Sequence, residues 1–194
     1  MTATTSISSA AFDGHRLLAH GTRLEAALAL KRALGEGVAG PLLVFDDETG
    51  AVVDFDLSGS DAEIASRLAE PEAPPRSRGR PKLGVVAREV TLLPRHWEWL
   101  AAQPGGASVA LRRLVDRARR EDGGATQARQ ALDAAYRFLQ AIAGDLPGFE
   151  EAARALFASD REGFARRVAD WPADIVTHAS LLLTNGAAAT PGAR

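Results

Sequence analysis

The start of the chain alternates apolar and polar positions and is broken by turn residues, a pattern that predicts strands. One pair of such runs, at 7–12 and 15–20, flanks Asp13-Gly14, a dipeptide typical of the tight type I′ turn of a β-hairpin. A second pair, at 41–45 and 51–57, flanks a short turn of acidic residues, Thr and Gly. The pattern therefore predicts two β-hairpins.

Apolar residues with a helical period follow each hairpin. Thr22 stands three residues before Glu25, and Ser60 stands three residues before Glu63. This is the spacing of a capping box, in which the two side chains bond each other's backbone at the start of a helix. The order of elements is then ββαββα, and residues 6–69 are predicted to form a small N-terminal α+β domain.

Residues 70–85, EPEAPPRSRGRPKLGV, show neither the alternation of a strand nor the period of a helix. Four prolines and the alternating arginines leave little to bury, so we expect an extended basic linker and the main domain boundary. Within it, Arg78-Gly79-Arg80-Pro81 followed by Lys82 resembles the core of an AT-hook, which lies in the minor groove of A/T-rich DNA. Glycine lets the backbone approach the groove floor, and arginine favours the negative potential of a narrow groove. A solubilising spacer is the alternative.

Residues 86–121 return to a regular pattern. A run of β-branched and apolar residues over 88–93 predicts a strand, and Pro94 suits the first position of a helix. We expect Ser108 to cap a second helix running to about Arg120. Its non-apolar positions are largely arginine: Arg112, Arg113, Arg117, Arg119 and Arg120. A merely solvated helix face is the competing interpretation of these arginines.

The strand, proline, helix, Gly-Ala-Ser turn and arginine-rich helix resemble the ribbon-helix-helix fold of the Met/Arc/CopG type of DNA-binding proteins. The resemblance implies an obligate homodimer in which two strands, Val90 to Leu93, pair into a ribbon that enters the major groove. It also implies that amides at the start of the second helix face a phosphate. The predicted DNA-binding residues are Arg76, Arg78, Gly79, Arg80, Pro81, Lys82, Arg88, Thr91, Arg95, Ser108, Arg112 and Arg113.

The last third of the chain has helical periodicity alone. Residues 125–185 are predicted to form a C-terminal helical region of three or four helices, with Ser159 and Glu162 as a further capping box. His178 is isolated in the sequence, and the other histidines (His15, His20 and His96) are scattered. No histidine and carboxylate show the spacing of a metal or general-base site, so we expect no cofactor and no enzymatic activity.

Acidic residues gather around the second predicted hairpin: Asp46, Asp47, Glu48, Asp54 and Asp56. Asp54 and Asp56 share one face of the predicted strand and could bind a hard cation. A half-exposed strand also needs a polar face, which favours a solvated acidic surface instead. A third hypothesis is that these acids compete with DNA for the basic centre of the chain.

Charge separates the centre of the chain from its ends. Residues 76–120 hold eleven of the 23 basic residues and three acidic residues, although the formal net charge of the whole chain is -2. A strongly positive segment in a near-neutral protein favours a polyanion as its partner.

The chain has no cysteine, which excludes disulfides, thiolate metal sites and thiol catalysis. The first ten residues, MTATTSISSA, lack the pattern of a signal peptide, and no apolar run approaches the ~18 residues of a membrane span. We therefore expect a cytoplasmic protein with no membrane contact.

Over nearly its full length the chain resembles a bacterial family, domain of unknown function 2239. The matching segments are GPLLVFDDETG, GRPKLGVVAREVTLLPRHWEWLAAQPGGASVALRRLV and AGDLPGFEEAARALF. The family implies no activity, so the functional expectation rests on the residues.

We expect a mixed α+β protein that binds double-stranded DNA. A dimeric transcriptional regulator or nucleoid-type binder with mainly phosphate and minor-groove contacts fits the basic centre best. The alternative is a protein-protein interaction module, an antitoxin-like or adaptor dimer whose C-terminal helices bind a protein partner.

Overall fold

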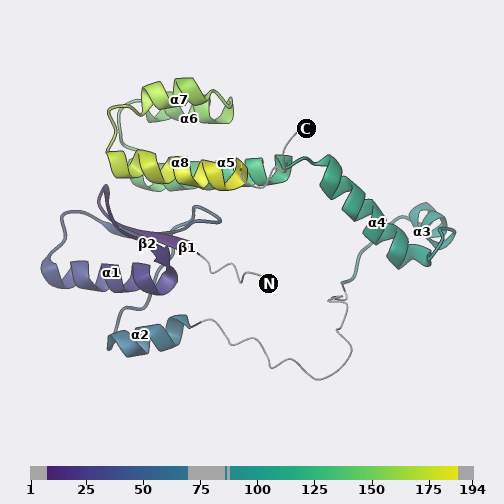
Figure 1. The fold of residues 1–194 in the computed structure, drawn as a ribbon, viewed down its shortest axis with the longest axis horizontal. Coiled ribbons are helices and arrows are strands. Elements are labelled where there is room, and N and C mark those ends of the chain that lie inside the picture. The colour runs from purple at the N-terminus through teal and green to yellow at the C-terminus, as the bar shows by residue number, and fades with distance from the viewer. Residues whose placement is uncertain (1–7, 70–85, 87, 188–194) are drawn as a thin grey trace. The chain divides into compact units, whose positions relative to one another are not determined.

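The computed structural model describes residues 8–69, 86 and 88–187, with the backbone alone for 185–187. These residues form a three-stranded antiparallel sheet and eight helices (Figure 1), which is the mixed α+β class that the sequence predicts. The chain divides into two compact units. Unit 1 joins residues 1–69 to 124–194, and unit 2 is residues 70–123. Among the helices described, none is long and apolar enough to cross a bilayer.

The sheet of unit 1 is built around its first strand. β1 (Ser8–Asp13) lies between β2 (Arg16–Thr22) and β3 (Leu42–Asp46), and both pairings are antiparallel. Five of the six residues of β1 are buried, because successive side chains point to opposite faces and both faces are covered. Phe12 belongs to the apolar core on one face, and Ala11 belongs to the core on the other.

The first hairpin is confirmed, with two corrections of detail. The two-residue loop is Gly14-His15 rather than Asp13-Gly14, and Gly14 alone has a positive φ, 56°. This fits a type II′ turn, since type I′ needs a positive φ at both central residues. Leu18 is the extra residue of a β-bulge in β2, because Ala11 pairs with Ala19 while Phe12 pairs with Leu17.

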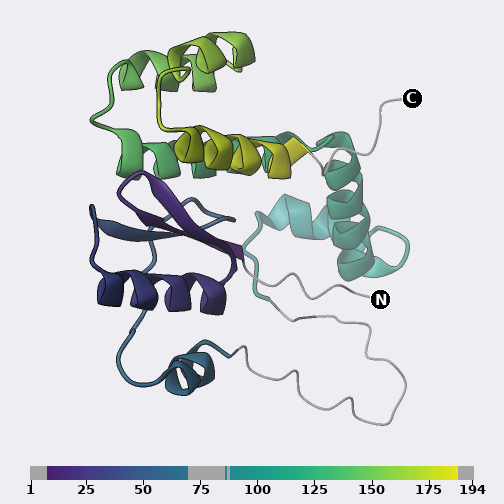
Figure 2. The ribbon, with the colours of Figure 1, turned by 60° about the vertical axis from the view of Figure 1, so that its left-hand side comes forward.

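One face of the sheet is covered by α1 (Arg23–Glu36), and α2 (Asp61–Leu68) packs against α1 (Figures 1 and 2). The capping boxes predicted for α1 and α2 are both confirmed. The Thr22 side chain accepts a hydrogen bond from the amide of Glu25, whose carboxylate accepts one from the amide of Thr22, and Ser60 and Glu63 repeat the arrangement.

The opposite face is covered by C-terminal helices. α5 (Ala125–Ala143) and α8 (Ala173–Ala187) lie side by side on the sheet, and α6 (Phe149–Phe157) and α7 (Arg161–Arg167) form a further layer outside them (Figures 1 and 2). The core between sheet and helices is aromatic and aliphatic. Its fully buried large side chains are Phe12, Phe45, Phe138, Leu139, Val168, Ile175 and Leu182.

The predicted N-terminal domain and C-terminal helical region therefore share one core. Two polar contacts add to the apolar packing: the amide of Leu17 donates to the Asp174 carboxylate over 2.8 Å, and Arg137 donates to the carbonyl of Thr49 over 3.0 Å. The physical reason is the two-sided sheet, because α1 covers one apolar face and leaves the other to the helices of the last third.

The second predicted hairpin is incomplete. Residues 51–57 form no strand beyond a single bridge between Phe45 and Val52, supported by the hydrogen bond from Val53 to the carbonyl of Val44. Val53, Phe55 and Leu57 nevertheless pack against the α1-side core. The alternating pattern thus predicts correctly which side chains are partly buried. It does not predict that residues 51–57 lack the regular hydrogen bonds of a strand.

The predicted cap at Ser159 is also displaced. Asp160 is the N-cap of α7, and its side chain accepts a 2.8 Å hydrogen bond from the amide of Gly163. Ser159 adopts a left-handed conformation, with φ 56°. An aspartate next to a serine offers an equally good cap, and the chain uses the later residue.

Unit 2 consists of two helices over its described residues. α3 (Pro94–Ala101) begins at the proline, as predicted, and packs against α4 (Gly106–Glu121). Residues 88–93 form no strand in the single chain, and Leu93 has an extended backbone. The buried apolar side chains among the described residues of this unit are Leu100 and Ala110.

Candidate functional site

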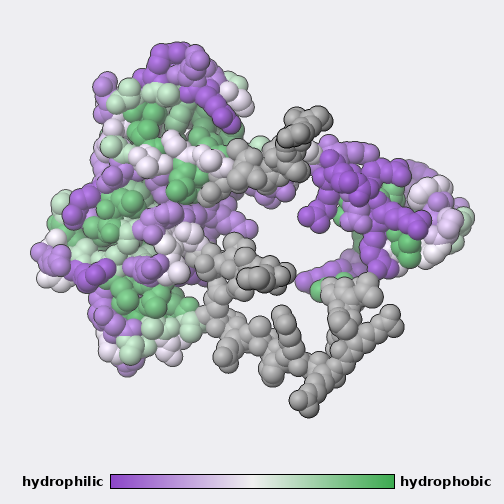
Figure 3. Space-filling view, in the orientation of Figure 1, coloured by the Kyte–Doolittle hydropathy of each residue, from purple (hydrophilic) through white to green (hydrophobic). Residues whose placement is uncertain are grey.

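The arginines of α4 cover much of its surface. Arg112, Arg113, Arg117, Arg119 and Arg120 are all exposed, and Figure 3 shows strongly hydrophilic residues gathered over this helix. At about 100° per residue they fall within one half of the helix circumference, with Asp116 among them. Leu111, Leu114, Val115 and Ala118 occupy the other half. α4 is therefore a helix with one basic face and one apolar face.

The helix begins earlier than predicted, so Ser108 is not its cap. The N-cap is Gly105, with φ 87° and no side-chain hydrogen bond. The left-handed conformation available to glycine turns the chain into the helix three residues before the predicted start. Ser108 instead lies in the first turn, where Arg112 donates to its carbonyl over 3.1 Å and to its hydroxyl over 3.3 Å.

Large apolar side chains of unit 2 are exposed. Of the eleven exposed large apolar side chains in the described residues, seven lie in this unit: Val86, Val90, Leu93, Trp97, Trp99, Leu114 and Val115. Trp99 is 52% exposed and Val115 is 55% exposed. A concentration of this kind marks an interaction surface more often than a free one.

The predicted DNA-binding residues are partly within the described residues. Arg76, Arg78, Gly79, Arg80, Pro81 and Lys82 lie outside them. Arg88 and Thr91 are exposed in the segment before α3, and Arg95 is exposed in the first turn of α3. Together with Ser108, Arg112 and Arg113 on α4, they belong to unit 2.

The acidic cluster of the second hairpin does not form one site. Asp46 is buried: its Oδ1 accepts hydrogen bonds from the amides of Glu48 and Thr49, and its Oδ2 accepts one from Arg23 over 3.2 Å. Asp54 and Asp56 are exposed. A solvated face thus describes Asp54 and Asp56 but is wrong for Asp46, whose carboxylate organises the turn after β3.

The structure brings together three side chains that sequence reasoning left apart. His20 lies on β2, Asp47 follows β3 and His178 lies on α8. Nε2 of His20 is 2.7 Å from Oδ2 of Asp47, and Nε2 of His178 is 3.4 Å from Oδ1 of the same carboxylate. His178 is therefore not isolated, and Asp47 is not on a solvated face.

A sequence signal for His178 exists in its helical position. Ile175, Ala179 and Leu182 mark the buried stripe of α8, and His178 falls on the same stripe. A histidine on a buried stripe needs a polar partner, but the sequence does not say which of the distant carboxylates supplies it.

The environment of Asp47 favours its charged form. Burial raises the pKa of this carboxyl, but interactions with the side chains of His178, Ser8 and His20 outweigh it and hold the pKa below its ordinary value. The amide of Asp47 donates to the carbonyl of Ser8 over 3.0 Å, which ties the turn to β1. The result is a carboxylate fixed between two imidazoles.

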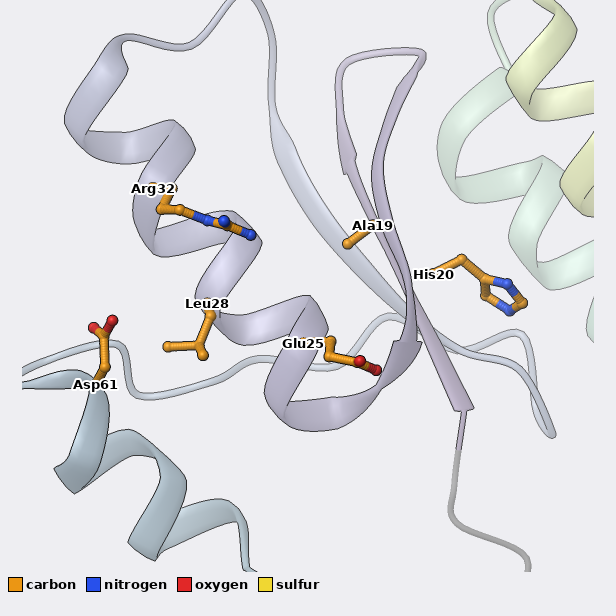
Figure 4. A pocket seen from close by; sticks show the side chains of 6 residues that line it. All are labelled: Ala19, His20, Glu25, Leu28, Arg32 and Asp61. Carbon is orange, nitrogen blue, oxygen red and sulfur yellow. The ribbon is translucent and has the colours of Figure 1, made fainter.

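A pocket of about 350 Å³ lies between β2, α1 and α2, on the face of the sheet that α1 covers (Figure 4). Its lining residues are Ala19, His20, Glu25, Leu28, Arg32 and Asp61, and the ring of His20 points away from Glu25, Leu28, Arg32 and Asp61, toward the C-terminal helices. His20 therefore lines the pocket, while its ring approaches Asp47 rather than the other lining residues.

Comparison with known proteins places the chain without giving it an activity. A search of curated proteins and a search of solved structures each gave no match. One family model matches residues 8–183, which spans both units. The chain thus belongs to the family described as "Uncharacterized protein conserved in bacteria (DUF2239)".

Proposed function

We propose that this protein binds double-stranded DNA as a dimer, with unit 2 as the binding module. The observation that carries the proposal is the two-faced α4, which has exposed arginines on one half and exposed Leu114 and Val115 on the other. One face suits the phosphate backbone, and the other suits a second protein surface.

The basic half of α4 supports contact with phosphates. Guanidinium groups match phosphate oxygens in a planar, two-pronged geometry, and several on one helix follow a curved backbone without reading bases. Residues 78–82 add an arm for the minor groove. Binding is then driven mainly by charge and groove shape, with little direct readout of sequence.

The apolar half of α4 and the segment before α3 support the dimer. Val90 and Leu93 are about half exposed, and the backbone around them is extended or irregular and belongs to no sheet within the described residues. A second copy of the same segment would supply the missing strand and cover Trp97, as in a ribbon-helix-helix dimer.

The test is a salt titration of DNA binding by the full chain. With about six phosphate contacts, affinity should fall roughly a thousandfold between 50 and 200 mM salt. Arg112→Ala/Arg113→Ala should reduce the slope of log affinity against log salt by about one for each phosphate that the variant no longer neutralises. The matched control is Arg166→Ala/Arg167→Ala, an adjacent arginine pair on α7 of unit 1.

Binding without a salt slope, or an equal loss in the α7 control, would contradict the proposal. The minor-groove arm has its own test: Arg78→Ala/Arg80→Ala should weaken binding to A/T-rich duplexes more than to G/C-rich duplexes. Equal weakening on both would assign the arm to phosphate contact alone.

A protein-protein interaction module is the second candidate. The exposed indoles of Trp97 and Trp99 on α3 favour it, because tryptophan is enriched at the centres of protein interfaces. The C-terminal helices are weaker support, because α5 and α8 bury their apolar stripes on the sheet of the same chain. Recovery of one stoichiometric protein partner after nuclease treatment, with no DNA binding by the purified chain, would favour this candidate.

A further inference from the structure

Two buried polar atoms in unit 1 face each other without a hydrogen bond. Nε2 of His178 and Oδ1 of Asp47 are inaccessible to solvent, and neither has a hydrogen-bond partner. They lie 3.4 Å apart, and the His178 side chain is 2% exposed. Leaving such groups unsatisfied destabilises the folded state, so buried polar groups in native proteins normally have a partner.

The third member of the group completes a set of metal ligands. Nε2 of His20 approaches the other oxygen of Asp47, and one ligand atom from each of the three residues can be chosen so that all lie within 4.8 Å of one another. We infer that His20, Asp47 and His178 form a binding site for a divalent transition-metal ion of the Zn²⁺ type. Two imidazoles and a carboxylate are the donor set that such ions prefer.

The spacing suits a tetrahedral ion. Bonds of about 2.0–2.1 Å place neighbouring ligand atoms roughly 3.3 Å apart, which fits the 3.4 Å between His178 and Asp47. His20 lies 2.7 Å from the other oxygen, Oδ2, so its ring must shift for one oxygen of Asp47 and both imidazoles to bind the same ion. His20 has room for this shift, because it lies on an edge strand and its side chain is 32% exposed.

The two buried ligands are held in place by their surroundings. The ring of His178 packs against Phe138 and Phe12, with centroids 4.7 and 5.6 Å away, and both contacts are near perpendicular. Asp47 is fixed through its amide, which donates to Ser8. The two buried ligands lie on the core side and His20 lies at the surface, so an ion would reach the site past His20.

Metal binding would join distant parts of unit 1. The three ligands come from β2, the turn after β3 and α8, so an ion would tie the C-terminal helix to two strands of the sheet. Binding would then raise the thermal stability of unit 1 as well as its metal content. This inference is independent of the proposed DNA binding, which concerns unit 2.

The test uses the full chain, stripped with a chelator and dialysed, then titrated with ZnCl₂ by calorimetry and by thermal melting. We expect one Zn²⁺ per chain and a rise in melting temperature. His20→Gln should weaken Zn²⁺ binding by at least about tenfold without unfolding the protein, because this side chain lies at the surface. His15→Gln, at an exposed position in the turn of the same hairpin, is the matched control and should bind as the wild type.

Asp47→Asn should give the same loss as His20→Gln. Absence of saturable Zn²⁺ binding in the wild type would overturn the inference, as would His20→Gln binding as tightly as the wild type. In either case the three side chains form a buried ion pair and hydrogen bond without a metal. A wild-type titration with Co²⁺ adds a check, since visible absorption typical of tetrahedral Co²⁺ supports the site and octahedral absorption counts against it.

Discussion

Units 1 and 2 differ in how completely each buries its own apolar residues. Unit 1 places a sheet between helices and buries a cluster that includes Phe12, Phe45 and Phe138. The described part of unit 2 buries Leu100 and Ala110 while exposing two tryptophans. Burial of apolar area is the main source of folding stability, so unit 1 gains more stability from its own core than the described part of unit 2 does. Substitutions of apolar residues in the two units should therefore differ in how far they lower the free energy of unfolding.

Phe138→Ala should have the largest effect. The ring is fully buried and contacts the rings of Phe12, Phe45 and His178, so its removal leaves a cavity in the core of unit 1. We expect a loss of about 3–5 kcal/mol in the free energy of unfolding, measured by urea titration with circular dichroism. Trp97→Ala in unit 2 should change the same transition by less than about 1 kcal/mol. Equal losses would remove the contrast between the units.

Gly50→Ala should have the next largest effect. Gly50 has φ 66°, and a Cβ there would overlap the carbonyl oxygen of Ala134 on α5. Strain and overlap together should cost roughly 2–4 kcal/mol. Gly148→Ala is the control, with φ 78° but no atom within 4 Å, and should cost about 1 kcal/mol. Similar losses in both variants would show that the turn after β3 does not need its close approach to α5.

Thr22→Ala should have a moderate effect. It removes the side chain that caps α1 and should destabilise unit 1 by about 1 kcal/mol in the same urea titration. Ser108→Ala should change stability by less than about 0.5 kcal/mol, because Ser108 is exposed and caps no helix. A loss of stability in Ser108→Ala as large as that in Thr22→Ala would indicate that Ser108 caps α4, as the sequence predicts.

Asp13→Asn should have the smallest effect, and the size of this effect should depend on pH. Amides of Ala39 and Gly40 donate to the Asp13 carboxylate, and with Arg16 they hold its pKa below the ordinary value. Its stabilising contribution is therefore complete above the ordinary pKa and is lost as the pH falls through the lowered pKa of the folded state. In acid melts, Asp13→Asn should lose less stability than the wild type between about pH 5 and 2. Parallel pH profiles would contradict this.

Local signals predicted the local structure well. The capping boxes at Thr22 and Ser60 and the proline start of α3 depend on residues within one helical turn, and all three are confirmed. Ser108 and Ser159 show the limit of the same reasoning. In place of Ser108, Gly105 begins α4 through its left-handed backbone. In place of Ser159, the side chain of Asp160 caps α7.

Contacts between distant residues could not be predicted from one sequence. His20 and His178 are both visible in the sequence, but their meeting at Asp47 depends on α8 packing against the far face of the sheet. The missing strand over 51–57 has a related cause, because pairing requires a partner in register as well as an alternating pattern. The segment from Val90 to Leu93 stays a predicted strand whose partner would be another chain.

The hydrogen bond between Leu17 and Asp174 spans 157 residues, and unit 2 lies between its two ends in the sequence. At about 5–20 residues per second, a ribosome takes roughly 10–30 s to synthesise that span. Within this span the sheet is complete at Asp46, while α5, the first helix on its second face, begins only at Ala125. Unit 2 is therefore synthesised before unit 1 can close its core, and the apolar face of β1 stays open to chaperones at least until α5 has been made.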